Sequence, residues 1–250
     1  MMMEPDYPDL SPRAELLGYF RTLLGQFGPQ HWWPAQTRLE MILGAILTQN
    51  TSWNNVFIAI SQLRRKGLLV KARLMNADAR EIEAAIRSSG FFRRKARTIR
   101  GFLDWLQRNY SGSLRRALAR PPLELRRELL ALRGIGPETA DAVLLYAANH
   151  PFFVADTYTR RILARHGWLA DGVGYGETQE FLHGNLPPDP ALFNEFHALL
   201  VETAKRHCHR AVTVCNGCPL EFDLAGHSRR SFPLRTSQPA GVVMPGPPGV

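Results

Sequence analysis

The stretch that most constrains this chain is LRGIGPETADA, residues 132–142. In it, Gly134 and Gly136 flank one aliphatic residue, and a helical pattern follows at once. Glycine adopts positive φ readily and lets a phosphate approach the backbone, and the first N–H groups of a helix carry the positive end of its dipole. The stretch therefore predicts a hairpin between two helices that grips a nucleic-acid backbone. A G-x-G pair by itself also fits an ordinary helix–helix turn.

The composition favours a polyanionic partner. The 250 residues carry a formal net charge of +9, and the pI is near 10.0. Cations that neutralise phosphates release counterions and so drive association, although many basic proteins bind nothing specific. No apolar run reaches the ~18 residues that a membrane span needs, and the N-terminus lacks the pattern of a signal peptide. Three clustered cysteines do not suggest a disulfide framework. We therefore expect a cytoplasmic protein, associated with the nucleoid if the source is bacterial.

Helical periodicity runs through most of the chain, and no segment shows convincing strand alternation. Helices are predicted at about 12–27, 38–47, 53–63, 79–88, 95–109, 140–148, 157–167, 175–184 and 193–205, and a further short helix is predicted to open at 121–125. Proline, glycine and serine dominate from Ser228 onward, which predicts a disordered tail. The sequence therefore predicts an all-α fold.

Polar, aromatic and basic residues gather at three helix junctions. Gln49 and Asn50 follow the helix at 38–47, where such a pair also fits helix capping. Two phenylalanines precede three cations in residues 91–95. This pattern fits a wedge into stacked bases with phosphate clamps, or one core residue beside a solvated face. The Trp-Trp-Pro of residues 32–34 fits either packing or a stacking platform.

Over residues 32–219 these motifs resemble the helix-hairpin-helix (HhH-GPD) DNA glycosylases of the endonuclease III superfamily. The resemblance rests on LTQNT at 47–51, SGFF at 89–92 with KA at 95–96, the stretch 132–142, VAD at 154–156 and the cysteine cluster. Within the superfamily the sequence is most similar to the endonuclease III-like 3-methyladenine DNA glycosylases. They share residues 32–34, 47–51, 89–91, and GIG at 134–136 followed by Glu138.

The resemblance implies two helical lobes with a cleft between them. A helical barrel at 37–148 would carry the helix-hairpin-helix, and residues 13–36 with 149–226 would form a second domain that includes the cysteine loop. Residues 1–12 and 227–250 would be a disordered lead and tail. The implied partner is double-stranded DNA with a damaged base, bound by a monomer, because a glycosidic carbon inside a stacked duplex is reached only when the nucleotide is flipped out.

The resemblance implies that Asp156 is the first catalytic residue. Positive charge grows on the sugar as the base departs, and a fixed carboxylate in a partly desolvated cleft stabilises that charge. The carboxylate could also orient or deprotonate the attacking water. Asp156 fits equally well as the N-cap of the helix that begins at Thr157, and the two roles are compatible.

Position 138 decides the reaction type within the family. Members that also cleave the strand carry a lysine here, because only a primary amine forms a Schiff base with the ring-opened sugar. Glu138 cannot do this, so a monofunctional glycosylase without lyase activity is expected. Glu138 is either a second catalytic carboxylate or a residue favoured by the helix dipole.

The base pocket and the DNA contacts also follow from the resemblance. The pocket would comprise Trp32, Trp33, Pro34 and Trp53, whose indoles would stack on a cationic alkylated purine. Trp53 also fits an ordinary core position. Gln49 with Asn50 would enter the gap left by the flipped nucleotide, Phe91 would wedge the opposite strand, and Arg93 and Lys95 would touch phosphates. The hairpin would bind the backbone through Leu132, Gly134, Ile135, Gly136 and Thr139.

Cys208, Cys215 and Cys218 match three of the four ligands of the family's iron–sulfur loop, and the fourth position falls on Leu224. His207, His209 and His227 are candidate substitute ligands for iron or zinc. The alternatives are a [4Fe-4S] cluster with an outside ligand, another metal such as zinc, or a loop that has lost its metal. The chemistry itself needs no cofactor.

The leading hypothesis is therefore a base excision repair glycosylase that hydrolyses the N-glycosidic bond of alkylated purines such as 3-methyladenine. One alternative is an endonuclease III-like glycosylase for oxidised pyrimidines or mismatches, with weak or no lyase activity. Another, of a different class, is a non-catalytic DNA-binding helix-hairpin-helix protein in which Asp156 acts only as a cap.

Overall fold

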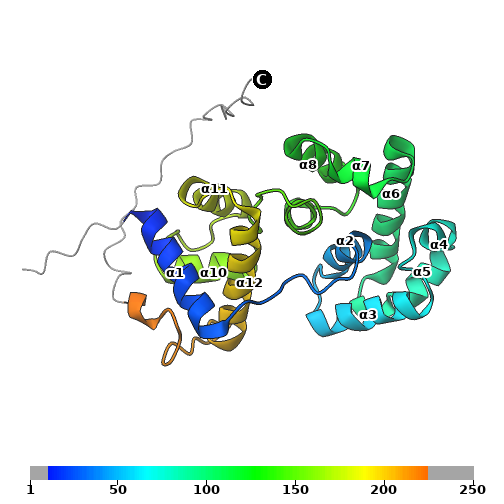
Figure 1. The fold of residues 1–250 in the computed structure, drawn as a ribbon. Helices are drawn as coiled ribbons and strands as arrows, with labels where there is room; N and C mark the ends of the chain where they lie inside the picture. Colours follow the sequence, from blue (N-terminus) through cyan, green and yellow to red (C-terminus); the bar gives the residue numbers. More distant parts are fainter. Residues whose placement is uncertain (1–10, 225–250) are drawn as a thin grey trace, which may run out of the picture.

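A computed structural model describes residues 11–224 of the chain, and its regular elements are all helices (Figure 1). In order they are α1 (Pro12–Phe27), α2 (Arg38–Leu47), α3 (Trp53–Arg65), α4 (Lys71–Asn76), α5 (Ala79–Ala85), η1 (Arg87–Ser89), α6 (Phe92–Tyr110), α7 (Leu114–Leu118), α8 (Pro122–Leu130), α9 (Pro137–Ala142), η2 (Val143–Ala147), α10 (Thr157–Arg165), α11 (Tyr175–Asn185) and α12 (Pro190–Arg206). The prediction of an all-α fold is confirmed for these residues. None of their helices is long and apolar enough to cross a membrane.

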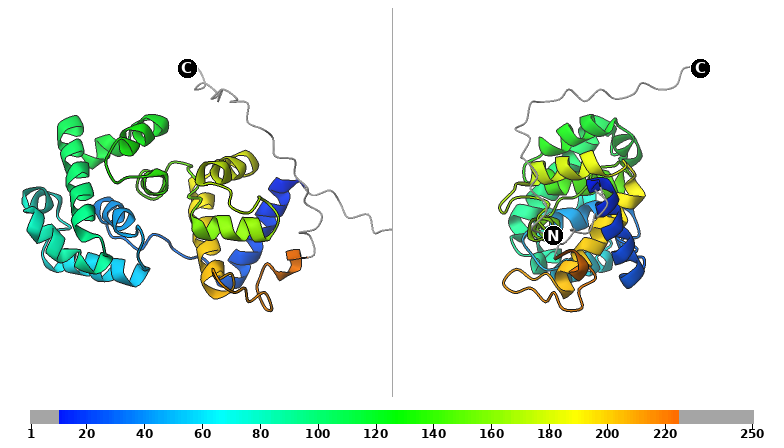
Figure 2. Two further views of the ribbon diagram at one scale, coloured as in Figure 1. Left: turned by 180° about the vertical axis from the view of Figure 1, so that it is seen from behind. Right: turned by 90° about the vertical axis from the view of Figure 1, so that its left-hand side faces the viewer.

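The helices form two groups, seen in Figure 1 and from behind in Figure 2. Helices α2 to α8 lie on one side, and α1 lies with α10, α11 and α12 on the other, so that the two ends of the described chain share one group. The segment formed by α9 and η2 contacts α2 and α8 on one side and α12 on the other. The residue bounds expected for the two domains stay a prediction.

Helix α2 is the central element of the first group. Every residue from Leu39 to Leu47 is buried, because the helix packs against α3, α6 and η2. Full burial of each large aliphatic side chain is worth about 1.5–3 kcal/mol, which explains an apolar run without an exposed face. The helix ends where the sequence turns to Thr48 and Gln49. A rigid, buried helix thus presents these polar residues at its C-terminus.

Asp141 on α9 joins the hairpin to both neighbouring helices. Its carboxylate is fully buried and accepts two bonds from Arg126 of α8, at 2.7 and 3.1 Å. From α11 it accepts one from the Tyr175 hydroxyl, at 2.9 Å, and one from Gln179 Nε2, at 2.8 Å. A buried charge is tolerated when it is paired in this way. The network fixes the orientation of α9 relative to α8 and α11.

The helix bounds differ from the predictions where local signals are weak. Helices α4 and α7 were not expected, since each is too short to show helical periodicity. Helix α6 begins at Phe92 rather than 95, immediately after Phe91 in a left-handed conformation. The single apolar helix predicted at 140–148 is instead α9 followed by η2, a π-helical turn.

Candidate active site

The glycine hairpin lies between α8 and α9, and its two glycines play different roles. Gly134 has a φ of +89°, and an added Cβ would come within 2.1 Å of Thr98 Oγ1 on α6, so only glycine fits. Gly136 has a φ of −96°, which corrects the expectation of positive φ there. An added Cβ at Gly136 would meet nothing within 4 Å, so the space beside this residue is open.

Two hairpin residues support the turn from inside and do not face solvent. The side chains of Ile135 and Thr139 are buried, so a contact of these residues with DNA would have to come from their backbone, and their role in DNA binding stays a prediction. Thr139 Oγ1 and the Gly134 carbonyl each accept a hydrogen bond of 2.9 Å from Gln49 Nε2. The loop after α2 is therefore joined to the hairpin. For Gln49 to enter a gap in DNA, it must exchange these two bonds for bonds to nucleotides, and that role stays a prediction, as does the role of the exposed Asn50.

Phe91 projects into solvent from the turn before α6. Its side chain is 61% exposed, and its φ of +44° follows the positive φ of Gly90. The Arg94 guanidinium lies 4.9 Å from the centre of its ring, and Arg93 is also exposed. An exposed aromatic beside cations is suited to contact bases with phosphates around them, since large exposed apolar side chains often mark interaction sites.

Lys95 does not face this surface, which corrects its assignment as a phosphate contact. It is 1% exposed, and its ammonium donates to the carbonyls of Leu47, at 2.8 Å, and Ser89, at 2.6 Å. Burial, assisted by the charge of Arg94, lowers the pKa of Lys95 to about 8. The side chain therefore ties the end of α2, which precedes Gln49, to the turn that precedes Phe91.

The buried amine gives a pH-dependent stability. Between about pH 8 and pH 10 the unfolded chain keeps the Lys95 proton while the folded chain releases it, because the unfolded pKa is 10.5 and the folded pKa is about 8. Stability rises with pH where the unfolded state binds more protons. The stability of the wild type relative to Lys95→Met is therefore expected to rise over this interval. Urea unfolding at several pH values measures it, and a difference that stays flat contradicts the burial of a titrating amine.

Asp156 is a buried carboxylate at the N-terminus of α10. Its Oδ1 accepts a 2.8 Å bond from Thr159 N, so the N-cap role is real. Its Oδ2 lies 3.6 Å from His197 Nε2 on α12. Burial raises the pKa of Asp156, but the nearby His197 and the bonds from Thr159 outweigh it, so the pKa lies below its usual value. The group is therefore an anion at neutral pH.

Glu138 is the second carboxylate near Asp156 and occupies the first turn of α9. Although Glu138 is exposed at the surface, the protein around it raises its pKa by desolvation, and the negative charge of Asp156 raises it further. His197 and Arg160 act in the opposite direction. Asp156 thus raises the pKa of Glu138, whereas His197 and Thr159 lower the pKa of Asp156 itself. Carboxylates whose pKa values are pushed apart are the arrangement by which one site holds both an acid and a base.

Three tryptophans form a cluster whose Trp33 ring contacts Tyr146. The ring centres are 5.1 Å apart for Trp32 and Trp33, 4.6 Å for Trp32 and Trp53, and 5.3 Å for Trp33 and Trp53. A cavity of about 330 Å³ is lined by Trp32 and Trp33 together with Ala35, Gln36, Thr37, Arg38, Met41, Tyr146 and Asn194. Trp53 and Pro34 do not line it. Trp53 instead packs against the two indoles that do.

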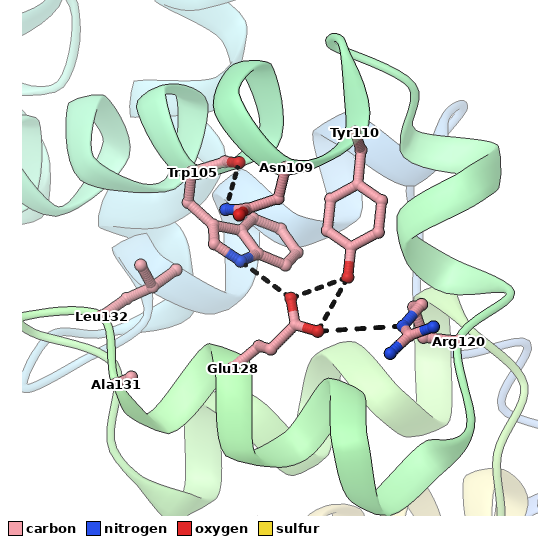
Figure 3. A pocket seen from close by; sticks show the side chains of 7 residues that line it. All are labelled: Trp105, Asn109, Tyr110, Arg120, Glu128, Ala131 and Leu132. Atoms are coloured by element: carbon pink, nitrogen blue, oxygen red, sulfur yellow. Dashed lines mark hydrogen bonds and ion pairs between the residues drawn. The ribbon is translucent and has the colours of Figure 1, made fainter.

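A second cavity of about 450 Å³ lies between α6 and α8 (Figure 3). Glu128 accepts bonds there from Trp105 Nε1, at 3.0 Å, and from the Tyr110 hydroxyl, at 2.7 Å, and Arg120 approaches it. Leu132, at the base of the hairpin, completes the wall. The polar groups of this cavity are satisfied by one another and brace α8 against α6.

The cysteine loop shows no arrangement of side chains suited to a metal ion within the part of the chain that the structure describes. Among residues 11–224 there is no group of three or more His, Cys, Asp or Glu side chains arranged to hold a metal ion. Cys208 Sγ lies 3.1 Å from Arg165 Nη1, and the backbone carbonyl of Cys208 accepts a hydrogen bond of 2.7 Å from Arg161 Nε. Arginines of α10 thus hold the start of the loop. His227, one candidate ligand, lies outside the described residues.

Sequence reasoning missed His197 and Tyr146, the two residues that join the Trp cluster to Asp156. The Tyr146 hydroxyl lies 2.5 Å from His197 Nδ1. Each residue lies in an apolar helical run, where a lone polar side chain gives no sign of its partner. The available signal was a histidine among buried residues of α12, and its significance depends on the approach of α12 to η2.

The two-lobed helical fold, the glycine hairpin and the capped, buried aspartate are together the architecture of a DNA glycosylase. The chain belongs to the HhH-GPD superfamily of base excision DNA repair proteins, whose family model matches residues 43–188.

Relatives and solved structures agree with this assignment. A protein of Methanocaldococcus jannaschii named as a DNA repair glycosylase is 41% identical over 208 residues, which are 82% of this chain and 94% of that protein. Endonuclease III of Sulfolobus acidocaldarius is 30% identical over 71% of this chain and 77% of its own length. The fold matches a trapped endonuclease III–DNA intermediate with a TM-score of 0.73 at 22% identity, covering 88% of this chain and 100% of the other. It also matches Helicobacter pylori 3-methyladenine DNA glycosylase, bound to 1,N6-ethenoadenine, with a TM-score of 0.67 at 24% identity. This match covers 77% of this chain and 96% of the other.

Proposed function

We propose that this DNA glycosylase is monofunctional and hydrolyses the N-glycosidic bond of alkylated purines, such as 3-methyladenine, in double-stranded DNA. The observation that carries the proposal is the pair formed by Glu138 and Asp156, two carboxylates with pKa values shifted in opposite directions. The pair offers an anion for the sugar and an acid for the departing base, and no amine for a Schiff base. We further propose that the protein acts as a cytoplasmic monomer.

In the proposed reaction Asp156 faces the sugar of the flipped nucleotide. The glycosidic bond breaks with its electron pair going to the base, and the carboxylate stabilises the cationic sugar that remains. Water then attacks the sugar carbon and gives up a proton, for which Asp156 is the nearest base held in ionised form. Glu138 is suited to hold a proton that a neutral departing base would take, because its own pKa is raised.

The cavity walled by Trp32 and Trp33, here named the Trp cavity, supports alkylated purines as the substrate class. At about 330 Å³ it lies in the range of small-ligand sites, and indole rings form its wall. A purine alkylated on a ring nitrogen is cationic and already has a weakened glycosidic bond, so indole faces attract it and it needs little acid assistance. The similarity to Helicobacter pylori 3-methyladenine DNA glycosylase supports the same substrate class.

A panel of single-lesion duplexes tests this proposal. The panel holds one alkylated purine, one ethenoadenine, one oxidised pyrimidine, one T·G mismatch and an undamaged duplex, each incubated with enzyme and analysed with and without alkali. Strand breaks are expected for the alkylated purine, and only after alkali. Breaks confined to the oxidised pyrimidine or the mismatch would overturn the substrate class, and breaks without alkali would overturn monofunctionality.

Alanine at Trp32 is expected to slow release of the alkylated base by about tenfold or more, because loss of a cation–π contact with the bound base is worth up to ~2 kcal/mol. Alanine at Trp53 is expected to slow release less, because Trp53 only supports the rings of Trp32 and Trp33. Phe57→Ala is the matched control, since Phe57 lies on α3 like Trp53 but is 61% exposed. Release by the control should match the wild type. Equal losses in all three variants would remove the Trp cluster from substrate selection.

A further inference from the structure

Tyr146 and His197 form a side-chain connection from the wall of the Trp cavity to the catalytic carboxylate. The Tyr146 ring lines the cavity 5.4 Å from the Trp33 ring, and its hydroxyl lies 2.5 Å from His197 Nδ1. His197 is 7% exposed, and its Nε2 lies 3.6 Å from Asp156 Oδ2. The connection joins η2 and the N-terminus of α10, which are consecutive elements of the chain, to the more distant α12.

The His197 Nε2 atom is unusual because it is buried and makes no hydrogen bond among the described residues. Buried polar atoms are nearly always paired, and an exception often marks a functional site. The Oδ2 atom of Asp156 lies 3.6 Å from this nitrogen, just beyond hydrogen-bond range. Tyr146 lies in the π-helical turn of η2, and such turns occur often at functional sites.

The electrostatics fix the proton that faces Asp156. Because Asp156 is an anion, His197 is stable beside it only when Nε2 carries a proton. Burial and the charges of Asp156 and Glu195 raise the pKa of Tyr146 well above its ordinary value, so the hydroxyl keeps its proton. The Tyr146 hydroxyl and His197 Nδ1 share a hydrogen bond, so Tyr146 holds the imidazole with its Nε2–H group directed at the carboxylate.

We propose that Tyr146 and His197 are positioning residues that couple a base in the Trp cavity to Asp156. The proposal rests on the function given above for Asp156 and for the cavity. A base stacked against Trp33 also contacts the Tyr146 ring, and this contact presses the hydroxyl and His197 toward α10. The Nε2–H group then closes the 3.6 Å separation and bonds to Oδ2, which fixes the carboxylate against the sugar only when the cavity is filled.

Single-turnover base release by four variants tests the coupling: Tyr146→Phe, His197→Gln, His197→Leu and the Tyr146→Phe, His197→Leu double variant. A hydrogen bond to a charged group is worth about 1.5–3 kcal/mol, or roughly 10- to 150-fold in rate. His197→Leu is expected to lose this factor. Tyr146→Phe should lose less, because the Nε2 proton remains, and His197→Gln should recover part of the rate through its amide donor. Affinity for a duplex with a base-free abasic analogue should be unchanged in all four, since no base fills the cavity.

The double variant separates action through His197 from direct action on the base. If Tyr146 acts through His197, Tyr146→Phe costs nothing further in the His197→Leu background. An equal cost in both backgrounds, or wild-type release by His197→Leu, would overturn the proposal. Abasic-duplex affinities that fell with the rates would reduce the pair to a structural role, and thermal melts identify variants that fail to fold.

A second readout does not depend on activity. In protein with ¹⁵N-labelled histidine, the NMR spectrum should show His197 protonated at Nε2, and an Nε2 without a proton would overturn the proposal. Failure of the proposed substrate class can be told apart from failure of the coupling. In that case the wild type releases another lesion of the panel, and the four variants are compared on that lesion. The coupling and the substrate class can therefore fail separately.

Discussion

Replacing Asp156 with asparagine is expected to reduce base release by roughly 10²- to 10³-fold or more, the usual cost of losing a fixed group that stabilises transition-state charge. Asparagine has the same size and caps helices as well as aspartate does, so α10 keeps its N-cap. The substitution therefore removes the negative charge and leaves the structural role of Oδ1 intact. Affinity for an abasic duplex and the melting temperature should change little.

Asp78→Asn is the matched control for this experiment. Asp78 caps α5 through a 2.7 Å bond from Glu81 N, so the same substitution is made at the same kind of helix position, but in an exposed site. Single-turnover release should be normal in Asp78→Asn and nearly absent in Asp156→Asn. Normal release in both would show that Asp156 acts only as a cap, and a glycosylase mechanism would then need another anion.

Helices with strong local signals could be predicted from sequence. The bounds of α1 and α2 follow from Pro12, from Gly28 with Pro29, and from the Thr37 cap, because these signals lie within the segment itself. Helices α4 and α7 could not be predicted, since a one-turn helix is stabilised by its packing. In the hairpin, the need for glycine at position 134 comes from Thr98 on α6, a contact that no local pattern contains.

The residues of the candidate site also fall into those that the sequence could identify and those that it could not. Asp156 and Glu138 belong to contiguous motifs and could be found from the sequence. Lys95 was misassigned because a cation within a basic run is ordinarily solvated, and only the packing of α6 against α2 places it under two carbonyls. His197 and Tyr146 act on Asp156 across three separate elements. Their roles depend on tertiary proximity, which periodicity and residue type do not record.

Lysine at position 138 is expected to add strand cleavage to a protein that we propose to be monofunctional. The wild-type carboxylate cannot condense with a sugar aldehyde, whereas a lysine amine on the first turn of α9 would stand near Asp156 and can form a Schiff base. Glu138→Lys should therefore cut an abasic duplex without alkali and yield a covalent protein–DNA product when borohydride is present. The matched control is Glu180→Lys, which makes the same charge change at an exposed position of α11.

The isosteric change Glu138→Gln tests the carboxyl group itself. If Glu138 donates a proton to the departing base, the loss should be large for ethenoadenine, a neutral base that needs protonation, and small for a cationic alkylated purine, which leaves without it. The pKa of Glu138 is raised, so wild-type release of ethenoadenine should fall as pH rises through that value, while release of the cationic base should not. Equal losses of base release on both lesions in Glu138→Gln would assign Glu138 to binding. Cleavage of the abasic duplex by Glu180→Lys as well as by Glu138→Lys would mean that any added amine suffices for strand cleavage. Lyase activity confined to Glu138→Lys, with a lesion-dependent loss in Glu138→Gln, would place the side chain of residue 138 at the sugar.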